Sequence, residues 1–190
     1  MVRMTKRRKQ SRRSARLDFA AIEVLGGLLP TDVIAQIAAG DAAEQSDESY
    51  GIPKGLKLRD EIARFYQIAH AHWESFETAK VANTSAPIGF VQRLLSECFG
   101  FKTLAKAAPK TLSERVFPVN FSAENGRIPV IIAPPAPADS RKPGIDEALA
   151  QFGEDTRKRS ATQLLQEYLN ADEDALWGIT CDGSILRIMR

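Results

Sequence analysis

Hydrophobic and polar positions along the first half of the chain predict helices. The clearest pattern lies at residues 57–80, where apolar residues recur every three or four positions and predict one long amphipathic helix. A shorter helix is predicted between Thr31, a candidate N-cap, and Gly40, a candidate stop. A third is predicted over residues 87–99.

Other parts of the first half carry a weaker pattern. Residues 17–29 are mostly apolar, but Gly26 and Gly27 weaken any continuous helix there and Pro30 ends it. Residues 41–56 combine acidic residues, glycines and a proline, and predict a loop.

The second half changes to strand patterning near residue 115. Residues 116–121 predict an edge strand, because Pro118 cannot donate to a sheet ladder. The Asn125-Gly126 pair favours a tight hairpin turn. Residues 128–133 are nearly all apolar and predict a return strand that is buried on both faces.

A proline-rich stretch at residues 134–144 predicts a linker or loop before the last elements. The remaining pattern predicts a short helix at 145–152 closed by Gly153, and a helix at 160–171 capped by Ser160. Asp182-Gly183 separates two apolar runs and predicts a final hairpin. Because its second strand runs to the last residue, we expect the chain to be cut from something longer.

These elements predict an α+β protein with a helical region at residues 17–110 and an α+β region at 111–190. The 190 residues suffice for one large or two small domains with a real core. No apolar run is long enough for a membrane helix, so no membrane partner is expected. Two cysteines, Cys98 and Cys181, are too few for a disulfide framework and favour a reducing, cytoplasmic setting.

Charge is distributed unevenly along the chain. Residues 1–16 hold eight basic side chains and no acidic one, whereas the remaining 174 residues hold 18 basic and 24 acidic side chains. A segment of this charge density has almost nothing to bury, so we expect a disordered basic arm. Such an arm suits a polyanion, with Arg7, Arg8, Arg12 and Arg13 as candidate phosphate contacts. A solvated tail without specific use is the equally weighted alternative.

A second basic run, Arg157, Lys158 and Arg159, precedes the capping Ser160. Cations beside a helix amino terminus form a plausible phosphate seat. A merely solvated charge run is the favoured alternative for these three residues. Neither basic segment implies sequence specificity, because phosphate contacts do not read bases.

Motifs of common enzymes are absent from the sequence. The chain contains no dinucleotide or nucleoside-triphosphate glycine loop, no nucleophile elbow and no zinc-protease motif. His70 and His72 are two residues apart and lack the spacing of a helical zinc pair. Cys98 is interpreted as a core residue, and no catalytic, cofactor or metal residue is assigned.

Short motifs in the last third resemble the amino-terminal region of large adenine-specific DNA methyltransferases of restriction–modification and phage-defence systems, including the DISARM-type methylase. The resemblance rests on the order of these residues: Arg157-Lys158-Arg159-Ser160, Leu164 to Asn170, Leu176 to Ile179, Gly183, and Leu186 to Arg190. An earlier part also resembles that region: Leu17-Asp18-Phe19, Gly26 to Pro30, Tyr50 to Pro53, and Gly55 to Ile62.

The resemblance implies a non-catalytic module of a DNA adenine-N6 methyltransferase, with an accessory DNA-binding or scaffolding role. The family's S-adenosylmethionine motif and its Asn-Pro-Pro-Tyr catalytic motif do not occur in these 190 residues. S-adenosylmethionine is therefore expected only for the full-length family, and no cofactor is expected for this chain. The implied partners are DNA, contacted through its backbone, and the methyltransferase domain or other restriction-system subunits.

The strand order is also similar to a degenerate restriction-nuclease-like fold. In such nucleases an acidic and lysine triad on the central hairpin holds magnesium, but the return strand here has no acidic residue and no lysine, and Asp139 and Asp146 follow it. We therefore expect a scaffold without the metal site. The alternative function is a free-standing nucleic-acid-binding or protein-interaction domain, and an unrecognised hydrolase is less favoured.

Overall fold

The computed structural model describes residues 21–190 except 28, 82, 155 and 156, and its compact units divide between Glu61 and Ile62. The basic arm at residues 1–16 lies outside the described residues. The first unit contains α1 (Thr31–Ala39), which confirms the predicted helix. Gly40 adopts the left-handed conformation, with φ 78°, and closes the helix as expected. Thr31 is its first helical residue rather than its N-cap, because Pro30 holds that position.

The long helix α2 (Leu58–Ala79) matches its prediction closely, but most of it is not buried. Among its described side chains only Phe76 is fully buried, whereas Ile62 is 59% and Tyr66 63% exposed. Amphipathic spacing therefore predicted where the helix lies, but it did not predict which of its apolar residues are buried in the core.

The third predicted helix divides into α3 (Ala86–Arg93) and a π-helical turn, η1 (Leu94–Cys98). The wider turn shows in the bond from the Phe99 amide to the Leu94 carbonyl, five residues back. Ile88 is exposed, while Phe90 is buried and stacks on Phe76 with ring centroids 4.8 Å apart.

A five-stranded mixed sheet forms the centre of the second unit, in the order β1-β4-β5-β8-β9. Its strands are β1 (Ala105–Lys106), β4 (Phe121–Ala123), β5 (Ile128–Ile132), β8 (Gly178–Cys181) and β9 (Leu186–Met189). The predicted hairpins are confirmed: β4 pairs with β5 across the Asn125-Gly126 turn, and β8 pairs with β9 across Asp182-Gly183. The central pair, β5 and β8, is parallel.

The expected strand at 116–121 is broken rather than continuous. Its first part forms β3 (Arg115–Phe117), which pairs with β2 (Lys110–Leu112) in a separate two-stranded sheet. Pro118 lies between β3 and β4, where its missing amide interrupts no ladder. As a result β4 is an internal strand of the main sheet and not its edge.

The expected helix at 145–152 is wrong. Residues there form a 3₁₀ turn, η2 (Gly144–Asp146), and then β6 (Leu149–Glu154), which pairs with β7 (Arg157–Arg159). The β6–β7 hairpin requires glycine at position 153, since a β-carbon there would lie 1.8 Å from the Arg157 carbonyl oxygen. Ile145 and Phe152 still enter the same core cluster, so a helical spacing of apolar residues is satisfied by a turn and a strand.

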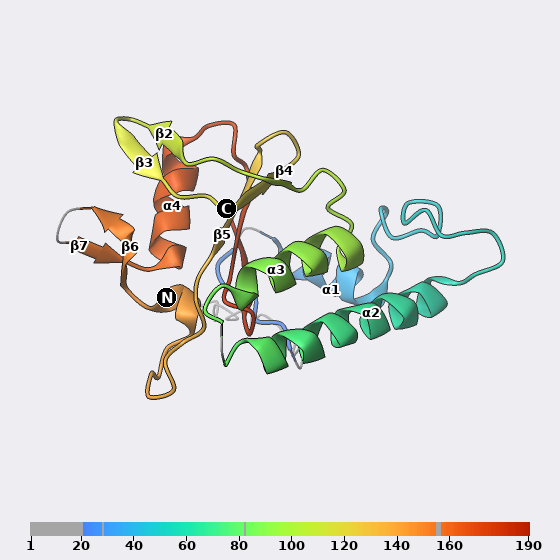
Figure 1. Ribbon diagram of the computed structural model, residues 1–190. Coiled ribbons are helices and arrows are strands. Elements are labelled where there is room, and N and C mark those ends of the chain that lie inside the picture. The colour runs from blue at the N-terminus through green and yellow to red at the C-terminus, as the bar shows by residue number, and fades with distance from the viewer. Residues whose placement is uncertain (1–20, 28, 82, 155–156) are drawn as a thin grey trace, which may run out of the picture. The chain divides into compact units, whose positions relative to one another are not determined.

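The last helix is α4 (Ala161–Ala171), close to its predicted range. It covers one face of the sheet, between the β2–β3 and β6–β7 hairpins, while α3 lies on the other face (Figure 1). Two core clusters result, because neighbouring residues of β5 point to opposite faces. Ile131 packs in the α4 cluster, and Val130 and Ile132 pack in the cluster with Phe76, Phe90 and Leu95.

The second unit is thus a mixed α+β structure, which agrees with the predicted fold class. In the part of the chain that the structure describes, no helix has both the length and the apolar character needed to cross a membrane.

Candidate nucleic-acid interface

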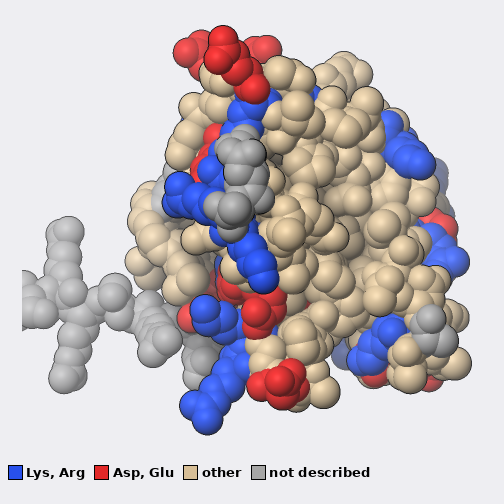
Figure 2. All heavy atoms as spheres, turned by 60° about the vertical axis from the view of Figure 1, so that its left-hand side comes forward, with Lys and Arg blue, Asp and Glu red and all other residues tan. Residues whose placement is uncertain are grey.

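The basic run at residues 157–159 forms β7 and does not precede the helix as a loose segment. Arg157 and Lys158 are exposed, and the strand is held by its pairing with β6. Figure 2 shows lysine and arginine side chains gathered in a column on this face, with acidic side chains among them. The structure therefore presents two adjacent cations from a paired strand.

Arg159 has a different environment from its two neighbours. Its side chain is buried, and its Nε donates to Oε1 of Glu167 on α4 at 3.1 Å. Arg115 on β3 contacts the other oxygen of the same carboxylate and lies over the Phe117 ring. Glu167 therefore joins β3 and β7 to α4, and Arg159 fastens the strand that displays Arg157 and Lys158.

Four of the predicted nucleic-acid contacts, Arg7, Arg8, Arg12 and Arg13, lie outside the described residues. Of the other three, the structure brings Arg157 and Lys158 to the surface and turns Arg159 inward. All three remain candidate contacts by prediction, but only the exposed pair has a side chain that can reach a phosphate without breaking an ion pair.

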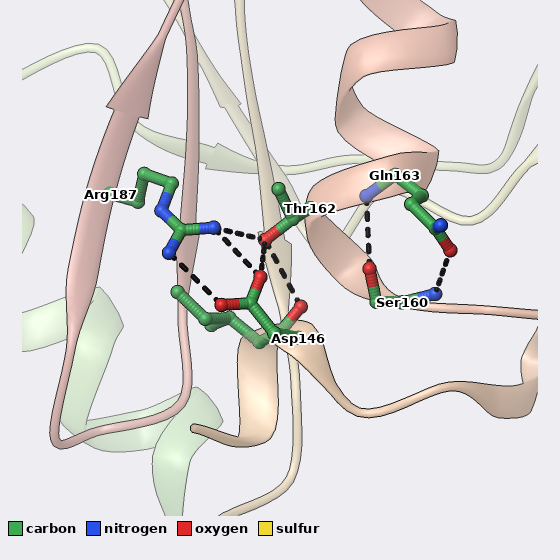
Figure 3. A network of polar contacts seen from close by, with 6 residues as sticks. Asp146, Ser160, Thr162, Gln163 and Arg187 are labelled. Atoms are coloured by element: carbon green, nitrogen blue, oxygen red, sulfur yellow. Dashed lines mark hydrogen bonds and ion pairs between the residues drawn. The ribbon is translucent and has the colours of Figure 1, made fainter. Parts of the chain in front are cut away.

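The amino terminus of α4 is closed by its own side chains. Ser160 Oγ accepts from the Gln163 amide at 3.1 Å, and Gln163 Oε1 accepts from the Ser160 amide at 3.1 Å (Figure 3). This capping box confirms the predicted role of Ser160. It also occupies the Gln163 amide, which an anion at this terminus would otherwise use.

Beside the capping box lies a polar network that joins η2, α4 and β9. Arg187 donates to both oxygens of Asp146, at 2.7 and 3.0 Å, and to Thr162 Oγ1 at 2.8 Å (Figure 3). Thr162 Oγ1 is also 2.7 Å from Asp146 Oδ1 and 3.1 Å from the Ile145 carbonyl oxygen. The Arg187 hydrogen bond lowers the pKa of Asp146, against the opposing effect of its burial.

Of the two acidic residues that follow the central hairpin, only Asp146 belongs to this network. Asp146 is ion-paired and half-buried, and Asp139 is exposed in the proline-rich loop. The bidentate guanidinium neutralises the Asp146 carboxylate that a metal would need. Among the described residues, no group of three or more histidine, cysteine, aspartate or glutamate side chains is arranged to hold a metal ion.

A shallow hollow of about 290 Å³ lies near the start of β2. It is lined mainly by small or apolar residues, with Lys110, Ser122 and Tyr168 as polar members. Lys110 Nζ lies 2.5 Å from Asp172 Oδ2 and 5.7 Å from the Tyr168 ring centroid. The side-chain hydrogen bond to Asp172 raises the pKa of Lys110, so the ammonium of this hollow is already paired with a carboxylate.

Neither cysteine has the environment of a nucleophile. Burial raises the pKa of Cys181 to about 12, and burial together with Glu97 raises the pKa of Cys98. His72 Nε2 lies 2.8 Å from Glu97 Oε2, and His70 Nδ1 lies 3.5 Å from Glu74 Oε1. The two histidines thus have separate carboxylate neighbours.

Sequence reasoning missed the pairings between distant residues. Arg187 and Asp146 come from β9 and η2, and Lys110 and Asp172 come from β2 and the end of α4. No spacing rule connects residues so far apart. The capping box was found because its two members lie within one helical turn.

Comparisons with known proteins found no matching family model, no matching curated protein and no matching solved structure.

Proposed function

We propose that this chain is a non-catalytic accessory module of a DNA adenine-N6 methyltransferase of a restriction–modification or phage-defence system, and that it contacts the DNA backbone. One observation carries the DNA contact: Arg157 and Lys158 are exposed side by side on a strand that Arg159 and Glu167 fasten to α4. Pairing of β7 with β6 fixes the backbone of both residues, so that only their side chains must become ordered when a phosphate binds. The family assignment is supported by the ordered motifs in the sequence.

The basic arm supplies the second part of the proposed contact. Eight cations within 16 residues attract any nucleic acid through counterion release, and the contact is independent of base sequence. In the DNA methyltransferases that this sequence resembles, methyl-donor binding and methyl transfer belong to the methyltransferase domain. We assign this module no step of that reaction. We propose that its scaffold is a degenerate nuclease-like one, in which Asp146 forms an ion pair with Arg187.

The test is DNA binding measured against salt. Fluorescence anisotropy with a labelled 20-base-pair duplex at 50–300 mM KCl gives both affinity and salt slope. Arg157→Gln/Lys158→Gln should reduce the magnitude of the log–log salt slope by about 2, because each lost phosphate contact removes about 0.9. Replacing Arg7, Arg8, Arg12 and Arg13 with glutamine should reduce it further, in proportion to the contacts removed.

The matched control is Lys54→Gln/Lys57→Gln, which removes the same charge from two exposed positions in the first unit. It should leave the slope close to that of the unaltered protein. An equal loss in the control, or an unchanged slope after all six arginine and lysine replacements, would contradict the proposed contact. A duplex of scrambled sequence should bind with the same affinity.

The second candidate is a protein-interaction domain, favoured by the open edge of the sheet. In the described part of the chain, β9 pairs with β8 on one side only, and Ile188 on this strand is 59% exposed. An unpaired edge strand can bind an extended segment of another protein. Replacement of Ile188 by lysine should weaken co-purification with the methyltransferase body and leave DNA binding unchanged.

A further inference from the structure

The helix α2 carries an exposed row of residues next to its buried one. Phe65, Ala69 and Phe76 run along the inner side, and Phe76 alone is fully buried. The neighbouring row consists of residues that alternate at four- and three-residue steps: Arg59, Ala63, Tyr66, His70, Trp73 and Glu77. That alternation is the seven-residue repeat of helices that pack against helices.

Three aromatic rings form the middle of the exposed row. Tyr66 and His70 have ring centroids 6.0 Å apart, and His70 and Trp73 have centroids 6.1 Å apart. Tyr66 is 63% and Trp73 43% exposed. Tyrosine and tryptophan in such a row are the residue types that most often dominate binding energy at protein interfaces.

Charge and side-chain size along this row are complementary to those of the same row running in the opposite direction. A cation, Arg59, stands at one end and an anion, Glu77, at the other. Ala63 is small and Trp73 is large, and they lie symmetrically about the midpoint between Tyr66 and His70. Two such helices placed antiparallel about that midpoint would bring Arg59 opposite Glu77, Ala63 opposite Trp73, and Tyr66 opposite His70.

A parallel arrangement lacks this complementarity. Arg59 would meet Arg59 and Glu77 would meet Glu77, and like charges at an interface oppose association. Both large Trp73 rings would also meet one another, while both Ala63 positions would leave a gap. The same row therefore selects one direction of packing.

We propose that the exposed face of α2 binds a second copy of this chain, with the two α2 helices antiparallel around a two-fold axis between Tyr66 and His70. Each contact then occurs twice, as closed two-fold symmetry requires. Glu77 also contacts Lys80, just after α2 in the same copy, at 2.5 Å, and its second carboxylate oxygen would bind the Arg59 of the other copy.

The first test measures self-association of the full chain by sedimentation velocity from low to high micromolar concentration. The unaltered protein should show a reversible dimer. Tyr66→Ala and Trp73→Ala should each raise the dimer dissociation constant more than tenfold. Phe99→Ala, which removes another exposed aromatic ring of the second unit, should leave it unchanged.

The second test fixes the direction of packing by charge reversal. Arg59→Glu should weaken the dimer, as should Glu77→Arg, because each creates two like-charged contacts. The double variant Arg59→Glu/Glu77→Arg should restore association to near the original value. Circular dichroism of each variant confirms that α2 remains folded.

Several results would overturn the proposal. A monomer at every concentration would exclude the interface, and a dimer insensitive to Tyr66→Ala and Trp73→Ala would place it elsewhere. Single charge reversals without rescue in the double variant would exclude the antiparallel register. If a variant unfolds, emission of Trp73 in a Trp177→Phe background gives a second readout: dilution should shift it to the red, and a concentration-independent spectrum would contradict burial of Trp73.

Discussion

The helices α2 and α4 are both amphipathic, yet they are used in opposite ways. The 11 residues of α4 bury Ala161, Leu164, Leu165 and Tyr168 against the sheet, whereas the 22 residues of α2 bury only Phe76. The short helix also has a capping box, its Glu167 forms ion pairs with β3 and β7, and its Thr162 hydrogen-bonds to Asp146 of η2. Length and periodicity therefore do not measure how much a helix contributes to the core.

The comparison is best tested by removing one apolar side chain from each helix. Leu165 is fully buried, and Ile62 is mostly exposed. We expect Leu165→Ala to lower the free energy of unfolding by about 2–5 kcal/mol, because transfer and cavity terms add. Ile62→Ala should change it by less than about 0.5 kcal/mol. Urea unfolding of both variants measures the difference, and equal effects would contradict the contrast between the helices.

A smaller effect is expected at the polar network that holds the start of α4. Asp146→Asn removes the charged acceptor of Arg187 and should lower the free energy of unfolding at pH 7 by about 1–3 kcal/mol. Folding lowers the pKa of Asp146, so its contribution is complete above the ordinary pKa of 3.8 and is lost as pH falls below it.

Unfolding of the two proteins measured from pH 7 to pH 3 checks this sign. The stability gap between wild type and Asp146→Asn should be constant down to about pH 4 and should then narrow. Asp139→Asn, in the exposed loop, is the control and should show no gap. If the stability difference between wild type and Asp146→Asn became larger in acid, the ion pair would not be its cause.

The capping box should contribute less to the free energy of unfolding than the Asp146 network does. Ser160→Ala removes the acceptor of the Gln163 amide and should lower the free energy of unfolding by about 1 kcal/mol. Gln166→Ala, on the same helix but outside the box, should change it by less than about 0.5 kcal/mol. Thermal unfolding followed by circular dichroism distinguishes the two, and a similar loss in both variants would mean that the box has no special role.

One change on the face covered by α4 should stabilise the protein. Thr180 lies in β8, is fully buried, and its hydroxyl has no hydrogen-bond partner in the described structure. Thr180→Val keeps the branched shape and removes the unpaired polar group, so the free energy of unfolding should rise by about 0.5–1 kcal/mol. Val130→Thr on the other face is the reverse experiment and should destabilise, as denaturant midpoints will show.

Local patterns predicted what local interactions decide. The ranges of α2 and α4, the Gly40 stop, the Ser160 cap and both hairpin turns were read from neighbouring residues. The sequence-based prediction of secondary structure was wrong where contacts between distant residues determine the conformation. Ile145 and Phe152 have helical spacing, but they enter the core from a 3₁₀ turn and from a strand that pairs with β7.

The candidate interface shows the same division. Sequence identified the three basic residues of β7, but their roles differ because of Glu167, which lies a full helical turn or more beyond them on α4. Pairing of Arg187 with Asp146 was also invisible, since it depends on the crossover that places β9 beside η2 and α4. Residue type identified the candidate contacts, and tertiary packing determined which of them are exposed and which are buried in ion pairs.

The parallel pairing of β5 with β8 has a consequence for how the chain folds. The β4–β5 and β8–β9 ribbons close locally, but joining them requires the whole segment from Ala133 to Trp177 to bridge the gap. Closing so long a loop loses chain entropy before any contact compensates for it. The union of the two ribbons is therefore the expected kinetic barrier to folding.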